Sequence, residues 1–156
     1  MPKHAETRPL PYDREQMFDL VADVGRYPEF LPWCRGARVY DRRDDQFRAD
    51  LVIGFKLFRE RFTSRVTLER PERIHVDYIR GPLKYLHNHW YFIDNGDGTT
   101  TIDFSVDFEF RNRLFESVVG SLFTEATTRM IAAFERRAAQ IYGSADEVTA
   151  ANPAAG

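Results

Sequence analysis

Residues 99–110, TTTIDFSVDFEF, alternate between polar and apolar side chains. From 102 to 110 every second residue is large and apolar, and the residues between them are Asp, Ser or Glu. Successive side chains of a strand point to opposite faces, so one face of this strand is buried and the other is wet. That pattern is typical of an antiparallel sheet that is open to solvent on one side.

The hydrophobic period changes from two to about 3.6 residues directly after this strand. Asn112 is placed to cap a helix that reaches about Tyr142, with apolar side chains on one stripe. At about 1.5 Å per residue, such a helix is roughly 45 Å long. A flat sheet of short strands is too small to cover it, so the sequence predicts a strongly curved sheet wrapped around the helix.

The earlier part of the chain supplies the other strands. Residues 3–10 form a first strand, a helix capped by Asp13 runs to Gly25, and a short helix follows between Pro28 and Pro32. From about 37 to 110 apolar residues recur at every second position, which predicts a run of strands. Hairpin turns are expected at 44–45 and at 95–98, NGDG, and a longer connection is expected at 81–86, GPLKYL. The predicted fold class is therefore α+β: a curved antiparallel sheet of about seven strands, two short helices after the first strand, and a long C-terminal helix.

Composition narrows the class of protein. The chain has 156 residues, 43% of them hydrophobic, which is enough for one core, and we expect a single domain over 1–143 and a disordered tail over 144–156. The net charge of −2 gives no field that would draw the protein onto DNA. We expect a cytoplasmic protein for three reasons. The chain has a lone cysteine, Cys34, it shows no apolar leader, and it has no run of about 20 apolar residues that could span a membrane.

Four segments resemble a known family. They are DVGRYPEFLPWC at 23–34, IGFKLFRERFTSRVTL at 53–68, GPLKYL at 81–86 with the Trp90–Phe92 strand after it, and DFEFRNRLFESVVGSLF at 107–123. In these motifs and in element order, the chain resembles the coenzyme Q-binding branch of the polyketide cyclase-like proteins. That branch has the helix-grip fold of the START and Bet v 1-like superfamily, and it also includes the bacterial ribosome-association toxins.

The resemblance implies an apolar tunnel between the sheet and the long helix that holds ubiquinone or a related polyprenyl quinone, with no other cofactor required. An isoprenoid tail needs an apolar lining, because burial gains about 25 cal/mol per Å². The alternative for each lining residue is a filled core. The expected lining residues are Phe62, Trp90, Phe92, Phe104, Val106, Phe108, Phe110, Phe115, Val118, Val119 and Leu122.

The segment GRYPEFLPWC, 25–34, is unusually apolar for a stretch with two prolines. We expect it to form a gate at the tunnel mouth, where ligand is exchanged during transient contact with the inner membrane. The alternative for this segment is a tightly packed plug under the sheet. Lys56 would donate to a quinone carbonyl or contact a lipid phosphate, and its alternative is a solvated lysine in a turn. The expected gate residues are Tyr27, Phe30, Leu31, Trp33, Phe55 and Lys56.

The resemblance also allows a different partner. Arg59, Arg61 and Arg65 form a stripe on the outer face of one strand. If acids on adjoining strands such as Asp77 or Asp103 pair with them, the stripe is an ordinary solvated face. If they are unpaired, they suit RNA of the large ribosomal subunit, which the resemblance implies as the partner of the toxin-like members.

Enzymatic chemistry has little support in the sequence. No phosphate loop, nucleotide fingerprint or catalytic triad occurs. The third hypothesis is a polyketide cyclase, which needs polar groups inside the sheet, but few polar residues fall at the inward positions of the predicted strands. His87 and His89 share a face but lack a third ligand, so no metal is expected. The leading hypothesis is a non-enzymatic lipid chaperone that supports respiratory electron transport.

Overall fold

The computed structural model describes residues 3–55, 58–113 and 123–143. The strands form one seven-stranded antiparallel sheet in the order β1-β7-β6-β5-β4-β3-β2, which confirms the predicted α+β fold class. The described elements are β1 (Lys3–Leu10), α1 (Arg14–Ala22), the 3₁₀ helix η1 (Val24–Glu29), β2 (Cys34–Tyr40), β3 (Gln46–Phe55), β4 (Phe58–Glu69), β5 (Arg73–Arg80), β6 (Leu83–Asp94), β7 (Thr100–Phe110) and α3 (Phe123–Tyr142).

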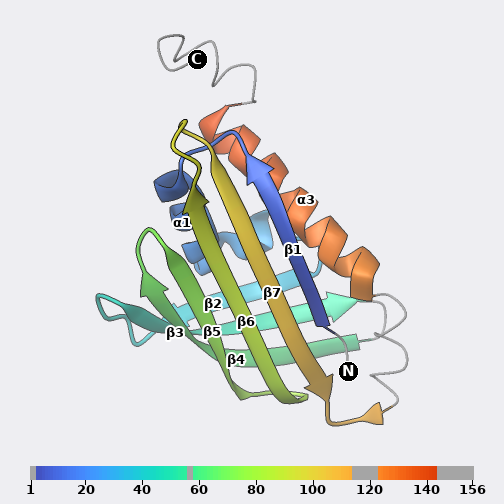
Figure 1. Cartoon of the computed structure of the whole chain (residues 1–156). Coiled ribbons are helices and arrows are strands. Elements are labelled where there is room, and N and C mark those ends of the chain that lie inside the picture. Colours follow the sequence, from blue (N-terminus) through green and yellow to red (C-terminus); the bar gives the residue numbers. More distant parts are fainter. Residues whose placement is uncertain (1–2, 56–57, 114–122, 144–156) are drawn as a thin grey trace.

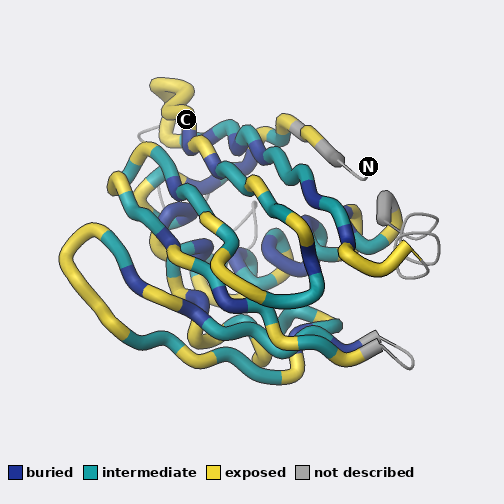
Figure 2. The backbone as a smooth tube through the Cα atoms, turned by 90° about the horizontal axis from the view of Figure 1, so that it is seen from below, coloured by how far each residue is buried: buried dark blue, intermediate teal, exposed yellow. Residues whose placement is uncertain are grey.

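The sheet is strongly curved, so that β2, β3 and β4 cross the direction of β6, β7 and β1 (Figure 1). Side chains of α1 and α3 join those of the strands in one buried cluster, which places both helices on the inner face of the sheet. Exposed stretches lie mostly at the turns between strands (Figure 2). The long helix held inside a curved sheet is the predicted arrangement.

The β6–β7 hairpin carries the strand that decided the fold. Its turn is the predicted NGDG, with Gly96 and Gly98 at φ of 84° and 86°, a backbone region that favours glycine. The N–H of Asn95 donates to the carbonyl of Thr99 at 3.1 Å and closes the turn. The turn sets the register that brings inward residues of the two strands opposite each other, Trp90 against Phe104 among them.

Helix α1 begins as its sequence predicts. The N–H of Gln16 donates to the Asp13 carboxylate at 2.8 Å, and the Asp13 N–H donates to the Gln16 side chain at 3.1 Å, which is a capping box. The helix ends at Ala22, earlier than the predicted Gly25. The separate helix predicted from Pro28 is instead η1, which contains Pro28, because i→i+3 bonds tighten the chain from Asp23 onward.

The prediction of a long connection at 81–86 was wrong. Strand β6 already begins at Leu83, because Gly81, at φ 148°, lets two residues reverse the chain. The Leu83 N–H donates to the Tyr78 hydroxyl at 2.9 Å, and the Leu83 side chain is fully buried. The expected start of the long helix, 114–122, and the expected tail, 144–156, lie outside the described residues.

Candidate ligand-binding interior

The inner face of β7 is apolar from Ile102 to Phe110, as its alternation predicts. Ile102, Phe104, Phe108 and Phe110 are each at most 7% exposed, and Val106 is half-buried. These five residues divide between two buried clusters. Ile102 and Phe104 belong to a main cluster that includes α1 and α3, whereas Phe108 and Phe110 belong to a second one. Val106 packs against both and joins them.

Aromatic rings fill the main cluster between the sheet and α3. The centroid of Trp90 lies 4.6 Å from that of Phe104 and 5.4 Å from that of Phe134 on α3. Phe92 meets Phe18 of α1 edge to face at 5.6 Å. Trp90, Phe92 and Phe104 therefore lie inside, where they were expected, and they pack on side chains of the protein itself.

The second cluster consists of strand residues. Leu83, Phe108 and Phe110 form its buried centre, and Phe62 is half-buried against it. It continues the apolar inner face toward the end of the sheet that lies away from the β6–β7 turn. The other partly buried residues packed on it are Tyr78, Leu86 and Val106.

Few polar side chains occupy this inner face. Asn88, opposite Val106, donates to the carbonyl of Ser105 at 2.9 Å and accepts from the Trp90 indole N–H at 3.1 Å. Glu60 stands opposite the inward residue Ile53 and is two residues from Phe62 on β4. The alternation therefore continues without a shift, and Glu60 faces inward and is half-buried.

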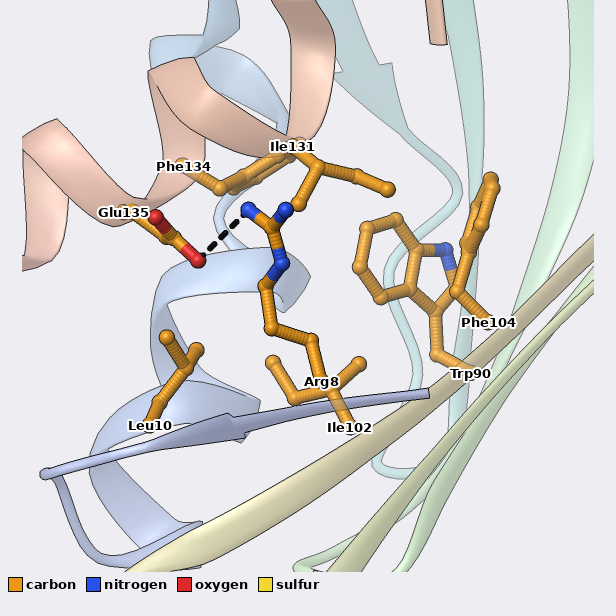
Figure 3. Close-up of a pocket in the computed structure, with 8 residues that line it drawn as sticks. All are labelled: Arg8, Leu10, Trp90, Ile102, Phe104, Ile131, Phe134 and Glu135. Carbon is orange, nitrogen blue, oxygen red and sulfur yellow. Dashed lines mark hydrogen bonds and ion pairs between the residues drawn. The ribbon is translucent and has the colours of Figure 1, made fainter. Parts of the chain in front are cut away.

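A small cavity lies between β1, β6, β7 and α3 (Figure 3). Its volume is about 20 Å³, enough for about one water molecule. Pockets that hold small organic ligands are typically about 300–1,000 Å³, so a quinone would need the surrounding side chains to move. The cavity is lined by Arg8, Leu10, Trp90, Ile102, Phe104, Ile131, Phe134 and Glu135.

One ion pair closes the side of this cavity. Arg8 lies opposite the buried Ile102 in the β1–β7 register, and its guanidinium donates to the Glu135 carboxylate of α3 at 2.7 Å. Sequence reasoning missed both residues. Arg8 is two residues from Leu10, so both side chains point to the same face of β1, and Leu10 is buried. The sequence of β1 does not alternate regularly between polar and apolar residues, so this relation was not evident beforehand.

The structure places the 25–34 part of the expected gate beside the described end of β3. Tyr27, Phe30 and Leu31 pack against the main cluster, and the Gly54 N–H donates to the Trp33 carbonyl at 2.9 Å. This bond places the end of the 25–34 segment beside the end of β3. The side chain of Phe55, and Lys56, Phe115, Val118, Val119 and Leu122, lie outside what the structure describes.

The arginine stripe lies on the outer face of β4, opposite the cavity side. Arg59, Arg61 and Arg65 are exposed, and Arg65 stands in register with Asp77 on β5. Within residues 3–55, 58–113 and 123–143, none of the three forms an ion pair. In the part of the chain that the structure describes, the acids of adjoining strands therefore form no ion pair with the stripe.

His87 and His89 share a face of β6, as predicted, and each stands opposite a residue of β5. His89 contacts His75 across the β5–β6 ladder, with their Nδ1 atoms 2.5 Å apart, while His87 stands opposite Asp77. Among the described residues, no three His, Cys, Asp or Glu side chains are grouped to hold a metal ion. Cys34 is buried, and this burial raises the pKa of its thiol, which favours the unreactive protonated form.

The sequence of residues 10–135 matches the polyketide cyclase / dehydrase and lipid transport family, and the chain belongs to that family. It is 38% identical over 134 residues to a ribosome association toxin RatA of Pseudomonas aeruginosa, covering 86% of this chain and 93% of that protein. It is 34% identical over 145 residues to coenzyme Q-binding protein COQ10 homolog B, mitochondrial, of Xenopus laevis, covering 90% of this chain and 59% of that protein.

Solved structures share the fold. A solution structure of an 18 kDa protein from Caulobacter crescentus, 36% identical, superposes with a TM-score of 0.76 over 92% of this chain and all of that one. A START superfamily protein from Mycobacterium smegmatis, 18% identical, gives a TM-score of 0.76 over 89% of this chain and 98% of that one. The helix-grip fold of the START-like proteins is thereby confirmed. No helix in the described part of the chain is long and apolar enough to cross a membrane.

Proposed function

We propose that this protein binds a polyprenyl quinone, ubiquinone or a close relative, in the apolar interior of the sheet and carries it without catalysis. The observation behind the proposal is the inner face of β7, which stays apolar from the main cluster through Val106 into the second cluster. A relative named as coenzyme Q-binding supports the ligand class. Hiding an isoprenoid tail from water there would contribute about 25 cal/mol per Å² of apolar surface.

Ligand exchange would take place at a membrane surface. A tail that is insoluble in water must pass from bilayer to protein without crossing bulk solvent, so the protein would visit the inner membrane as a peripheral protein. The segment 25–34 and the end of β3, which meet at the Trp33–Gly54 bond, are the proposed gate. In this proposal the protein supports respiratory electron transport by delivering quinone.

Organic extraction of the purified protein followed by mass spectrometry tests the proposal. Co-purified quinone, and saturable binding of added quinone, are the expected results. Repeated absence of quinone together with no binding on titration would contradict it. An extract of a folded domain from another family, purified from the same cells, controls for quinone carried over from membranes.

A second candidate function is association with the large ribosomal subunit. The arginine stripe on β4 favours it, since these exposed cations form no ion pair with the described residues and exposed cations suit a phosphate backbone. Relatives named ribosome association toxin support it. The test is cosedimentation with ribosomal subunits of the wild type and a variant with Arg59, Arg61 and Arg65 changed to Glu. Changing the exposed Arg43, Arg113 and Arg136 to Glu alters the net charge equally and is the control.

A further inference from the structure

Arg8 is a charged residue at a position built for an apolar one. Its neighbour across the β1–β7 ladder, Ile102, is buried, and so is Leu10, the next inward residue of β1. β1 is an edge strand of the sheet, and α3 runs beside it (Figure 1). Natural sequences break the hydrophobic pattern mainly where function requires it.

The partner of Arg8 is on the element that covers the interior. The Arg8–Glu135 pair spans the seam between β1 and α3 at 2.7 Å, and its two side chains are 33% and 35% exposed. Behind the pair, Leu10, Trp90, Ile102, Phe104, Ile131 and Phe134 surround the cavity (Figure 3). Water therefore reaches the ion pair from one side, and apolar side chains lie on the other.

Such a pair closes the seam without locking it. The pair is only partly buried, so water solvates both charges when they separate, and we expect its net contribution to stability to be small. The C-terminal end of α3 is held more firmly, since the Tyr12 hydroxyl donates to the Gly143 carbonyl at 2.8 Å and the Tyr142 hydroxyl donates to the Gln16 carbonyl at 3.0 Å. The seam can thus open at Arg8 and Glu135 while the end of the helix stays in place.

We propose that the seam between β1 and α3 is an entry route for the lipophilic ligand and that the Arg8–Glu135 ion pair is its latch. The inference rests on the proposed quinone-binding function and adds a second path, separate from the gate proposed at residues 25–34, together with the residues that control it. The 20 Å³ cavity is the closed form of this route, and side-chain movement of Trp90 and Phe134 widens it.

The experiment follows the rate of quinone uptake by fluorescence after rapid mixing with a ubiquinone that has a short, soluble tail. Glu135→Gln and Arg8→Gln remove the latch and should speed uptake up to about fivefold, the limit set by a weak exposed pair. Added salt should speed uptake by the wild type, because it screens the pair, and should have a smaller effect on Glu135→Gln. Glu125→Gln removes the exposed Arg129–Glu125 pair of the same helix and is the matched control.

A second variant makes the seam immobile. Arg8→Cys and Glu135→Cys are combined with Cys34→Ala, which removes the one native cysteine, and a short bismaleimide then joins the two new thiols. The joined protein should take up quinone far more slowly than the same protein before joining. Equal uptake rates in the joined and unjoined forms, with normal binding at equilibrium, overturn the latch and leave the quinone proposal intact. Absence of binding by the wild type at equilibrium overturns both.

Discussion

The rings of Tyr27 and Phe134 meet edge to face, with their centroids 5.4 Å apart. This contact joins η1 to α3, and Phe30 completes it with a centroid 5.2 Å from that of Phe134. The Tyr27 hydroxyl donates to the carbonyl of Val21, and burial raises the pKa of Tyr27 above its ordinary value of 10.0. The expected gate segment is therefore anchored to the core at its Tyr27 end, and any opening must start farther along it.

This anchor predicts a graded loss of stability. Tyr27→Phe keeps the ring but removes the hydroxyl, and should lower the free energy of unfolding by about 1 kcal/mol. Phe134→Ala removes a ring that contacts Tyr27, Phe30 and Trp90, and should cost about 3–5 kcal/mol. Urea denaturation followed by circular dichroism measures both. A Tyr27→Phe protein as stable as the wild type would show that the hydroxyl does not hold the segment.

Blocking the passage between the two clusters should abolish quinone binding. Val106 touches both clusters, so Val106→Trp would fill the space between them, at an overpacking cost of about 1–3 kcal/mol. Ile93→Trp adds the same side chain on the outer face of β6, where Ile93 is 47% exposed, and should bind quinone normally. Titration of both folded variants decides; full affinity in Val106→Trp would rule out a tail that passes Val106.

Ribosome association, if it uses the arginine stripe, should depend on salt. A cation that contacts a phosphate releases a counterion, so each of Arg59, Arg61 and Arg65 that binds RNA contributes about one to the slope of log affinity against log salt. Arg61→Ala should therefore lower that slope by about one. Binding isotherms at several salt concentrations measure the slope, and a slope unchanged in all three single variants would exclude the stripe as the contact.

The imidazoles of His75 and His89 contact each other across the β5–β6 ladder, and this contact should make the stability of the protein depend on pH. Their Nδ1 atoms, 2.5 Å apart, need one donor and one acceptor, so two cationic rings are disfavoured. Burial, and then the positive charges of His75 and His87, lower the pKa of His89 from 6.5, while Asp77 opposes the shift. In the window between the lowered value and 6.5, the folded state binds fewer protons than the unfolded chain, so the free energy of unfolding falls as the pH drops through it.

NMR titration of the histidine ring protons tests this. In His75→Gln one positive neighbour is gone, so the pKa of His89 should move up toward 6.5 but stay below it, because the burial remains. The loss of stability on acidification should also become smaller in this variant. A pKa of His89 that does not change would show that the two rings do not interact in solution.

Much of the fold could be predicted from local patterns. The alternation of 99–110, the NGDG turn and the Asp13–Gln16 capping box each correspond to an element at the expected place. Boundaries were less predictable. β6 begins at Leu83 because Gly81 lets the chain reverse, and the Tyr78 hydroxyl accepts from the Leu83 N–H there. The 3₁₀ helix η1 replaces a predicted helix because its hydrogen bonds tighten to i→i+3. Such bonds depend on neighbours that a local pattern does not contain.

The candidate site, too, could be predicted from the sequence only in part. Strand parity was sufficient to place Trp90, Phe92, Phe104, Phe108 and Phe110 on the inner face. Parity does not tell whether an inward aromatic ring lines a space or fills it, and in the described part of the interior the rings contact one another around a small cavity. Arg8 and Glu135 are 127 residues apart in sequence, and no pattern along the chain connects them.

Sequence alone determined which face of each strand is apolar, where the β6–β7 hairpin turns and that a long helix follows, because these depend on interactions between residues close in the chain. Tertiary structure alone decided that an arginine of the first strand meets a glutamate of the last helix, that the outer arginines lack acidic partners among the described residues, and that aromatic rings occupy the centre. Those outcomes depend on the curvature of the sheet, which brings distant segments together and fixes the volume left between them.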